Sequence, residues 1–411
     1  MKKDIVFLCQ YFYPENNSSA TLPFDTAEYL AENGLSVGAV CGYPGEYTNK
    51  KRVPKNEVVS EVEIQRLNYL HIKRAKKIGR LINYFSFTIS ALFNIRKLKN
   101  YRGIVVYSNP PILPVVALLA NLLFGTKIIF VSYDVYPEIA VVMNSLTNHS
   151  LITHCMNRIN RKLFKKASLV VALTDEMKDY LLGRRPQLSE QRIITISNWA
   201  HEEDNATCNC DYTQPQADEN SFTVTYLGNM GICQEMDTIM AAAEELENYS
   251  NVKFVLAGHG SKKQSIEKLV SEKRMNNITV TEFLTGCQLE QLMVRSSCFV
   301  VTLEDGIEGM CAPSKYYSYL LGGKPVISIT GRNSYLAREI ECEHIGVAIS
   351  IGDFAGLANT IVKLAESPEE KQTMGACARK LYYSKYSKKI SLEKYSNAIN
   401  DVIRNKEKVI N

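Results

Sequence analysis

The stretch from Glu308 to Ile327 carries the residues best suited to binding an anion. A loop punctuated by glycine and proline leads into a short predicted helix, with Ser314 as its N-cap and Lys315 in its first turn. Backbone N–H groups at a helix N-terminus lack intrahelical partners, and the helix dipole favours negative charge there. A lysine in the first turn opposes the dipole, so its position favours a bound anion. The alternative is an ordinary loop, helix and strand of an α/β domain.

A second loop of this kind follows the predicted strand from Phe222 to Leu227. It has the sequence Gly228-Asn-Met-Gly231, and a helix is predicted from about Met236 to Leu246. A strand, a glycine loop and a helix start place backbone N–H groups where a phosphate binds. The motif alone is weak, so its weight comes from its combination with the first stretch.

Two carboxylates could act as a general base or contact an acceptor hydroxyl. Asp134 and Glu138 follow the predicted buried strand from Lys127 to Ser132. Ligands bind at the carboxyl ends of the strands in α/β sheets, so these residues lie where a site is expected. The alternative is structural, because acidic residues also stabilise a helix N-terminus.

The order of elements around these residues predicts an α/β protein. A strand from Ile5 to Cys9, a helix from Ala20 to Asn33 and a strand from Val37 to Cys41 open the chain as a βαβ unit. No Gly-x-Gly-x-x-Gly follows the first strand, so a dinucleotide site is not expected there. The pattern restarts at Phe222, and 411 residues are enough for two domains. The predicted parts are residues 1–197, a linker over 198–220, a second domain over 221–380 and a C-terminal helical region over 381–411, with one long basic helix from Tyr382 to Lys408.

The ends of the first stretch, Glu308 and Gly322-Gly-Lys-Pro-Val-Ile327, resemble the donor-sugar motif of glycosyltransferase family 4. The segment from Tyr226 to Gly231 resembles the donor phosphate loop of that family, and Pro313-Ser-Lys-x-Tyr317 is similar to a bacterial subgroup that builds surface polysaccharide. The resemblance covers nearly the whole chain. It implies the GT-B fold, with two Rossmann-like α/β domains facing a cleft and a C-terminal helix that crosses back to the first domain.

The chain departs from the family pattern at several positions. Many members carry a second Glu eight residues after the first, where this chain has Tyr316. Alignment back from Gly323-Lys-Pro instead places that Glu on Ser318. Members often carry Arg or Lys where this chain has Asn229 and Gln234, so Lys315 is the cation expected to neutralise the donor pyrophosphate.

The resemblance implies three sets of site residues. The catalytic set is Asp134, Glu138 and Glu308, of which Glu308 would meet the hydroxyls of the donor sugar. The acceptor side is Tyr13, Glu15 and Asn16. The donor-binding set, in which backbone groups near Leu284 would read the base, is Gly228, Asn229, Gly231, Gln234, Gly258, Leu284, Pro313, Ser314, Lys315 and Ser318.

The implied activity is retaining transfer of an N-acetylated or deoxy hexose from a UDP-sugar. The acceptor would be a saccharide on a polyprenyl diphosphate, in the assembly of O-antigen or capsule. No cofactor or metal is expected, because GT-B enzymes stabilise the leaving group with cations and helix dipoles, and the nucleotide sugar is a substrate. Two alternatives stay open: a catalytically inactive nucleotide-sugar-binding or partner protein, and another GT-B enzyme such as a nucleotide-sugar epimerase.

Positive charge is concentrated in the first half of the chain. No Asp or Glu lies between Ile64 and Tyr133, whereas the same segment holds eleven Lys and Arg. We therefore expect the segment from Lys73 to Lys99 to form a basic amphipathic helix on an anionic membrane surface, unless it is a buried helix with basic ends. No nucleic-acid motif accompanies the charge, so nucleic acid is not expected as a partner. The expected location is the cytoplasm, peripheral on the inner face of the cell membrane.

The cysteines also favour a reducing compartment. Eleven cysteines lie at scattered positions, which predicts free thiols, and Cys208-Asn-Cys210 has a poor spacing for zinc. The apolar part of the N-terminus is too short for a signal peptide and predicts a first buried strand.

Overall fold

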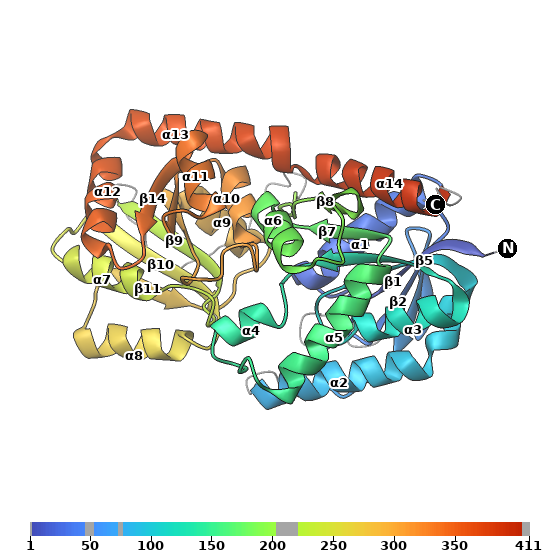
Figure 1. Ribbon diagram of the computed structural model, residues 1–411. Helices are drawn as coiled ribbons and strands as arrows, with labels where there is room; N and C mark the ends of the chain where they lie inside the picture. The colour runs from blue at the N-terminus through green and yellow to red at the C-terminus, as the bar shows by residue number, and fades with distance from the viewer. Residues whose placement is uncertain (1, 46–52, 73–76, 203–220, 405–411) are drawn as a thin grey trace. The chain divides into compact units, whose positions relative to one another are not determined.

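The structure is a computed structural model that describes residues 2–45, 53–72, 77–202 and 221–404 (Figure 1). It divides into two compact units. The first contains residues 1–198, 309–312 and 389–411, and the second contains residues 199–308 and 313–388.

The described part of the first unit is built on an eight-stranded sheet with the order β3-β4-β2-β1-β5-β6-β7-β8. Only β3 runs antiparallel to its neighbour, β4. The central strands are buried runs of apolar residues, as expected for parallel strands that are covered on both faces. The strands are β1 Lys3–Leu8, β2 Val37–Gly42, β3 Asn56–Val59, β4 Val62–Leu67, β5 Tyr101–Tyr107, β6 Lys127–Ser132, β7 Leu169–Ala172 and β8 Ile193–Thr195.

Helices cover both faces of this sheet. Helices α1 and α14 lie on one face, and α2, α3 and α5 lie on the other (Figure 1). Helix α14 is fixed to the sheet by the Lys127 Nζ, which donates to the Val402 carbonyl at 2.8 Å. The C-terminal helix thus packs on the first unit, as the resemblance implied. The helices are α1 Ser18–Glu32, α2 Lys77–Phe93, α3 Pro114–Phe124, α4 Glu138–Val142, α5 Leu151–Lys166, α6 Asp175–Arg184 and α14 Lys388–Arg404, with 3₁₀ turns η1 Ile95–Asn100 and η2 Glu190–Arg192.

The described part of the second unit contains a six-stranded, fully parallel sheet with the order β11-β10-β9-β12-β13-β14. Strands β9 and β12 are neighbours, so the loops that follow them leave the same edge of the sheet. The strands are β9 Phe222–Asn229, β10 Val252–His259, β11 Ile278–Thr281, β12 Cys298–Thr302, β13 Val326–Thr330 and β14 Gly346–Ser350.

Two apolar cores stabilise the second unit, and each joins a group of helices to the sheet. Helices α7 and α12 pack in one core, and α10, α11 and α13 pack in the other. Burying one large apolar side chain contributes about 1.5–3 kcal/mol, so these cores fix the helices, and with them the loops that join the helices to the strands. The helices are α7 Asp237–Glu245, α8 Lys263–Lys273, α9 Cys287–Arg295, α10 Lys315–Gly322, α11 Tyr335–Cys342, α12 Phe354–Glu366 and α13 Pro368–Leu381, followed by a π-helical turn, η3 Tyr382–Tyr386.

One predicted element is wrong. The segment from Tyr382 to Lys408 is not a single helix, because Ser387 is extended, with φ −60° and ψ 150°, and separates η3 from α14. The basic and apolar periodicity on either side of Ser387 is continuous, so the pattern alone did not reveal the break.

The cysteine prediction is also wrong at one position, since Cys287 is disulfide-bonded. Cys9, Cys41 and Cys298 are buried and not in disulfides. Cys208 and Cys210 fall outside the described residues, as does most of the predicted linker. None of the helices in the described part of the chain is both long and apolar enough to cross a membrane.

Candidate active site

The strand β9, its glycine loop and the start of α10 meet around the side chain of Lys315. The Lys315 Nζ donates to the Tyr226 hydroxyl and, at 3.1 Å, to Gln234 Oε1. It also lies 3.6 Å from the centre of the Tyr226 ring. A Cβ placed on Gly228 would be 3.8 Å from Lys315 Cε, so the lysine lies directly beside the glycine loop. The two loop-to-helix junctions predicted from the sequence are therefore adjacent.

The glycines of this region allow two backbone loops to touch. Gly228 has a φ of +100°, which favours glycine. A Cβ on Gly258 would lie 1.8 Å from the Gly228 carbonyl oxygen, and a Cβ on Gly231 would lie 2.7 Å from the Asn229 side chain. The loop after β10 thus supports the loop after β9, and the Met230 N–H donates to the His259 carbonyl at 2.6 Å.

Helix α10 begins at Lys315, but Ser314 does not cap it with its side chain. Ser314 has helical backbone angles and makes no side-chain capping bond, so its predicted capping role is wrong. The helix is instead fixed from its buried side, where the Tyr319 hydroxyl accepts a hydrogen bond from the Leu227 N–H at 2.8 Å. Ser314 is exposed, whereas Pro313 and Ser318 are half-buried. The Tyr316 N–H already donates to the Pro313 carbonyl at 3.0 Å, and the helix dipole still favours negative charge at this end.

The surroundings of Lys315 destabilise its charge. Burial lowers the pKa of its ammonium group well below the ordinary value. Its described partners are a hydroxyl, an amide oxygen and an aromatic ring, and none of the ion pairs among the described residues involves it. An anionic ligand at this position would therefore gain a strong electrostatic partner.

Glu308 lies within the loop that joins β12 to α10. Its Oε1 would be 2.4 Å from a Cβ on Gly331, which follows β13, so Gly331 leaves the room that this carboxylate occupies. Leu284 is buried, whereas its neighbour Phe283 is exposed and packs edge-on against His259 at 5.4 Å. The structure thus places these predicted donor residues after strands of one parallel sheet.

Asp134 follows β6 in the first unit and is half-buried. Its backbone N–H donates to Ser108 Oγ at 3.0 Å, which fixes the start of the loop. Burial raises the pKa of its carboxyl to about 6, against a lowering effect of Arg80. A carboxyl with this pKa can accept a proton near neutral pH, which suits a general base.

Glu138 has a different environment. It is the first residue of α4, and its Oε1 lies 2.6 Å from Nη2 of Arg185, a buried side chain. This ion pair, together with the position at a helix start, agrees with the structural alternative for Glu138. The carboxylate is thus held by a cation, whereas no ion pair is described for Asp134. The partner that could not be predicted is Arg185, which lies 47 positions further along the chain and follows α6.

Four residues of the loop before α10 belong to the first unit. The Val135 N–H donates to the Met310 carbonyl at 2.7 Å, and Asp134 and Cys311 form an isolated antiparallel bridge. The Gly309 N–H donates to Glu176 Oε2 at 3.1 Å. This whole loop was predicted to belong to the second domain, because nothing in its composition marks the change of unit.

The acceptor-side residues predicted from the sequence follow β1. The Tyr13 ring stacks on Phe24 with 5.0 Å between centres, and Glu15 Oε1 accepts from the Gly45 N–H at 2.9 Å. Glu15 is buried and Asn16 is exposed. Strands β1 and β6 both flank β5, so the acceptor-side loop and Asp134 leave the same edge of the first sheet.

Two further features of the donor region were not predicted. The Tyr226 hydroxyl donates to the Asn229 carbonyl at 2.6 Å, and so links the glycine loop to Lys315. Lys262 Nζ donates to the Gln234 carbonyl at 2.7 Å and pairs with Glu304. No sequence signal distinguishes these residues from ordinary strand and surface positions. Within the described ranges, no cluster of His, Cys, Asp and Glu could hold a metal ion.

Residues 212–381 match the family model of glycosyl transferases group 1. This part of the chain is a glycosyl transferases group 1 domain. This domain contains the glycine loop, Glu308 and Lys315, which are the residues that carried the resemblance in the sequence.

Curated relatives of this glycosyltransferase are distant but extend over most of its length. The "Probable glycosyltransferase WbjE" of Pseudomonas aeruginosa is 23% identical over 341 residues, which cover 80% of this chain and 81% of that protein. WcaI of Escherichia coli, named as a colanic acid biosynthesis glycosyl transferase, is 21% identical over 334 residues, or 77% of this chain and 81% of that protein.

Solved structures show the fold. Sucrose-phosphate synthase of Thermosynechococcus elongatus has a TM-score of 0.71 at 15% identity, covering 98% of this chain and 99% of that one. HepE of Anabaena, solved in complex with UDP-glucose, has a TM-score of 0.68 at 13% identity, covering 97% of this chain and all of that one. The glycosyltransferase therefore has the GT-B fold that the sequence resemblance implied.

Proposed function

We propose that this glycosyltransferase moves a hexose, N-acetylated or deoxy, from a UDP-sugar to a saccharide carried on a polyprenyl diphosphate, with retention of configuration. The observation that carries the proposal is the position of Lys315 beside the Gly228 loop. A half-buried ammonium group, a glycine loop and a helix start at one place suit a diphosphate.

The donor chemistry follows from this arrangement. When the bond between the sugar C1 and the diphosphate oxygen breaks, negative charge develops on the leaving UDP. Lys315 and the backbone N–H groups of α10 stabilise that charge most strongly as it forms. The crystal structure of HepE with UDP-glucose supports UDP as the nucleotide, since that protein shares the fold.

The acceptor chemistry needs a base. Asp134 takes the proton of the acceptor hydroxyl as its oxygen bonds to C1, and UDP leaves with the electron pair of the broken bond. Its raised pKa supports this role, whereas the ion pair of Glu138 with Arg185 supports a positioning role for Glu138. Retention without an identified nucleophile suggests attack from the face that the leaving group occupies. Glu308 would hold the sugar hydroxyls.

The biological role proposed is the assembly of a surface polysaccharide such as O-antigen or capsule. The name of WcaI, which states colanic acid biosynthesis, supports this role. A polyprenyl-linked acceptor lies in a membrane, so the enzyme would work peripherally on the cytoplasmic face of the cell membrane.

A single face of the first unit supports the membrane part of the proposal. We call it the α2–α3–α5 face, after the helices that form it. Helix α2 exposes Leu81, Phe85, Ile89 and Phe93, which follow one another at intervals of four residues and so form one stripe. Phe93 is 86% exposed, and Leu122 of α3 is 78% exposed. An apolar stripe of this kind, exposed to solvent, is typical of a helix that lies in a membrane interface.

The charge of this face complements an anionic membrane. Helices α2, α3 and α5 and the turn η1 contain no Asp or Glu. Their exposed basic residues are Arg80, Arg96, Lys99, Arg158, Arg161, Lys162, Lys165 and Lys166. Each basic side chain near an anionic surface contributes about 1 kcal/mol, so eight of them with apolar anchors suffice for reversible binding. Lys73, Arg74 and Lys76, at the start of the segment predicted to bind the membrane, lie outside the described residues.

The donor assignment is tested by a thermal-shift screen against UDP-, GDP-, ADP- and dTDP-sugars, followed by transfer of labelled sugar to lipid extracted from bacterial membranes. We expect UDP-sugars to stabilise the protein, and the label to appear in the lipid fraction with wild-type enzyme but not with Lys315→Ala. The outcomes that oppose the proposal are also distinct. Stabilisation without transfer to any lipid would favour the inactive binding protein, and isomerisation of the free UDP-sugar would favour an epimerase.

A further inference from the structure

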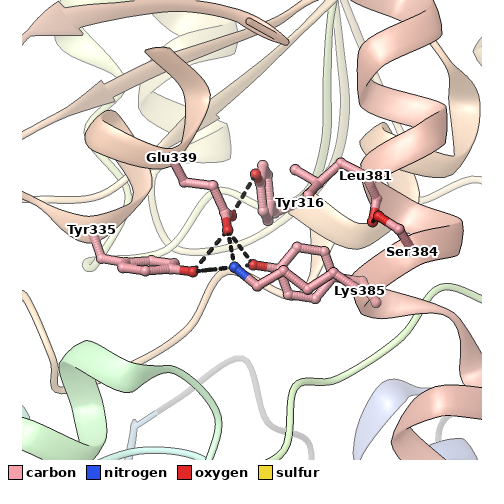
Figure 2. A network of polar contacts seen from close by, with 7 residues as sticks. Tyr316, Tyr335, Glu339, Leu381, Ser384 and Lys385 are labelled. Atoms are coloured by element: carbon pink, nitrogen blue, oxygen red, sulfur yellow. Dashed lines mark hydrogen bonds and ion pairs between the residues drawn. The ribbon is translucent and has the colours of Figure 1, made fainter. Parts of the chain in front are cut away.

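The carboxylate of Glu339 in α11 is a buried junction between three elements of the second unit. Only 6% of the residue is exposed. Its Oε1 accepts hydrogen bonds from the Tyr335 hydroxyl at 2.7 Å and from Lys385 Nζ at 2.6 Å, and also from the Tyr386 hydroxyl. Its Oε2 accepts from the Tyr316 hydroxyl at 2.8 Å. Figure 2 shows Tyr316, Tyr335 and Lys385 converging on this carboxylate.

The buried carboxylate is stabilised because each of its partners either compensates its charge or donates a hydrogen bond to it. Lys385 compensates the negative charge, and the hydrogen bonds it makes to Glu339 and Tyr335 raise its pKa against the lowering effect of burial. Burial raises the pKa of the Tyr316 hydroxyl, so this group stays protonated and donates. A buried carboxylate with four donors is rigid, since each lost bond would leave a buried charge poorly satisfied.

Tyr316, which bonds to Glu339, is joined to Lys315 of the donor region by a single peptide bond. Tyr316 follows Lys315 directly, and both lie in the first turn of α10. The Ser314 side chain makes no capping bond there, so the side chain of Tyr316 is the described contact that fixes this turn to α11. Tyr319 fixes the helix one turn later, to the backbone of β9. The bond between Tyr316 and Glu339 therefore sets the position from which Lys315 reaches Tyr226 and Gln234.

We propose that Glu339 is a positioning residue for donor binding, which acts through Tyr316 to hold Lys315 in place for the diphosphate. This inference rests on the proposed function, in which Lys315 faces the donor diphosphate. Glu339 itself touches no donor atom in this arrangement. Its second set of bonds, to the π-helical turn that ends at Tyr386, anchors the same carboxylate from the opposite side. π-Helical turns recur at functional sites, where they place side chains that a regular helix would not.

The test measures UDP affinity by calorimetry and the melting temperature of the same variants. We expect Glu339→Gln and Tyr316→Phe to weaken UDP binding by about three- to tenfold, the effect of losing one well-placed hydrogen bond. The variant Asn277→Ala is the matched control, because Asn277 is also buried and bonds the Ala243 carbonyl at 2.7 Å, in a different part of the unit. It should lower the melting temperature and leave UDP affinity unchanged.

A double-mutant comparison separates positioning from plain destabilisation. If Glu339 acts through Lys315, the variant with both Lys315→Ala and Glu339→Gln should bind UDP no more weakly than Lys315→Ala alone. Fully additive losses, or a Glu339→Gln variant that melts earlier yet binds UDP like wild type, would overturn the inference. If Glu339→Gln does not fold, the same comparison of UDP affinities can be made with Tyr316→Phe. Unchanged UDP affinity in Lys315→Ala would instead refute the donor assignment under the proposed function.

Discussion

At the scale of single residues, the charge of Lys315 is the most informative feature. Its ammonium group is half-buried among neutral partners, and burial lowers its pKa. A bound diphosphate would stabilise the charged form and raise the pKa again. Binding should therefore take up a proton at alkaline pH, which makes the affinity for the donor depend on pH.

We expect UDP to bind more weakly as the pH rises into the alkaline range, because burial makes free Lys315 lose its proton at a lower pH than an ordinary lysine. Calorimetry in buffers with different ionisation enthalpies would detect the proton taken up on binding. Lys315→Arg is the matched variant, since arginine keeps its charge throughout, and it should remove most of the pH dependence. Lys315→Ala should lower affinity about tenfold or more at pH 7. A pH dependence that persists in Lys315→Arg would assign the proton to another group.

The carboxylate of Asp134 gives a second prediction on pH dependence. Its pKa of about 6 means that transfer should decline as the pH falls below 6, where the base becomes protonated, and Asp134→Asn should abolish most activity. The same shift affects stability. The pKa of Asp134 in the folded protein lies above the usual carboxyl value near 4. The free energy of unfolding therefore falls as the pH rises from 4 to 6, because the unfolded chain ionises more readily in this range.

The free energy of unfolding should reveal this cost when wild type is compared with Asp134→Asn. Between pH 4 and pH 7, wild type should lose about 2.4 kcal/mol relative to the variant, most of the full effect of a shift of about two pKa units. Urea unfolding at several pH values measures the difference. A constant difference across this range would show that Asp134 titrates normally.

At the scale of elements, strands and helices were predicted where burial is continuous along the sequence. The strand from Phe222 to Leu227 and the helix after the glycine loop are present as β9 and α7, because their apolar residues occupy the sheet and one face of the helix. Thr174 caps α6 in the same local way, since its side chain accepts a hydrogen bond from the Met177 N–H at 3.0 Å. Local patterns of this kind depend only on residues close in sequence.

Elements fixed by distant residues were not predicted. Ser314 was expected to cap α10, but bonds from Tyr316 to Glu339 and from Leu227 to Tyr319 hold this helix instead. Gly309–Ala312 joins the first unit through Val135 and Glu176, more than 130 positions away. Lys315 and Gly228 were predicted to lie close together, because both follow strands expected in one parallel sheet. Nothing in the sequence indicated that the Tyr226 side chain connects them.

At the scale of the whole chain, the distribution of charge matters more than its total. The net charge is only +5, yet the helices of the α2–α3–α5 face carry no acidic residue. Under the proposed function, electrostatic attraction would bring this face to anionic lipid, and the apolar stripe of α2 would then insert between the headgroups. Since attraction between exposed charges is screened by salt, the two contributions can be separated experimentally.

Sedimentation with vesicles of phosphatidylglycerol and phosphatidylcholine tests this surface. We expect wild-type protein to bind anionic vesicles and to dissociate partly in about 0.5 M salt, where screening shortens the reach of the charges. Phe85→Ser with Phe93→Ser should weaken binding about tenfold or more by removing two apolar anchors, while UDP affinity stays unchanged. Val294→Ser is the control, because Val294 is 74% exposed on α9 of the second unit and outside the proposed surface. Equal vesicle binding by the double variant and the control would rule out insertion of α2 and leave the sugar-transfer proposal intact.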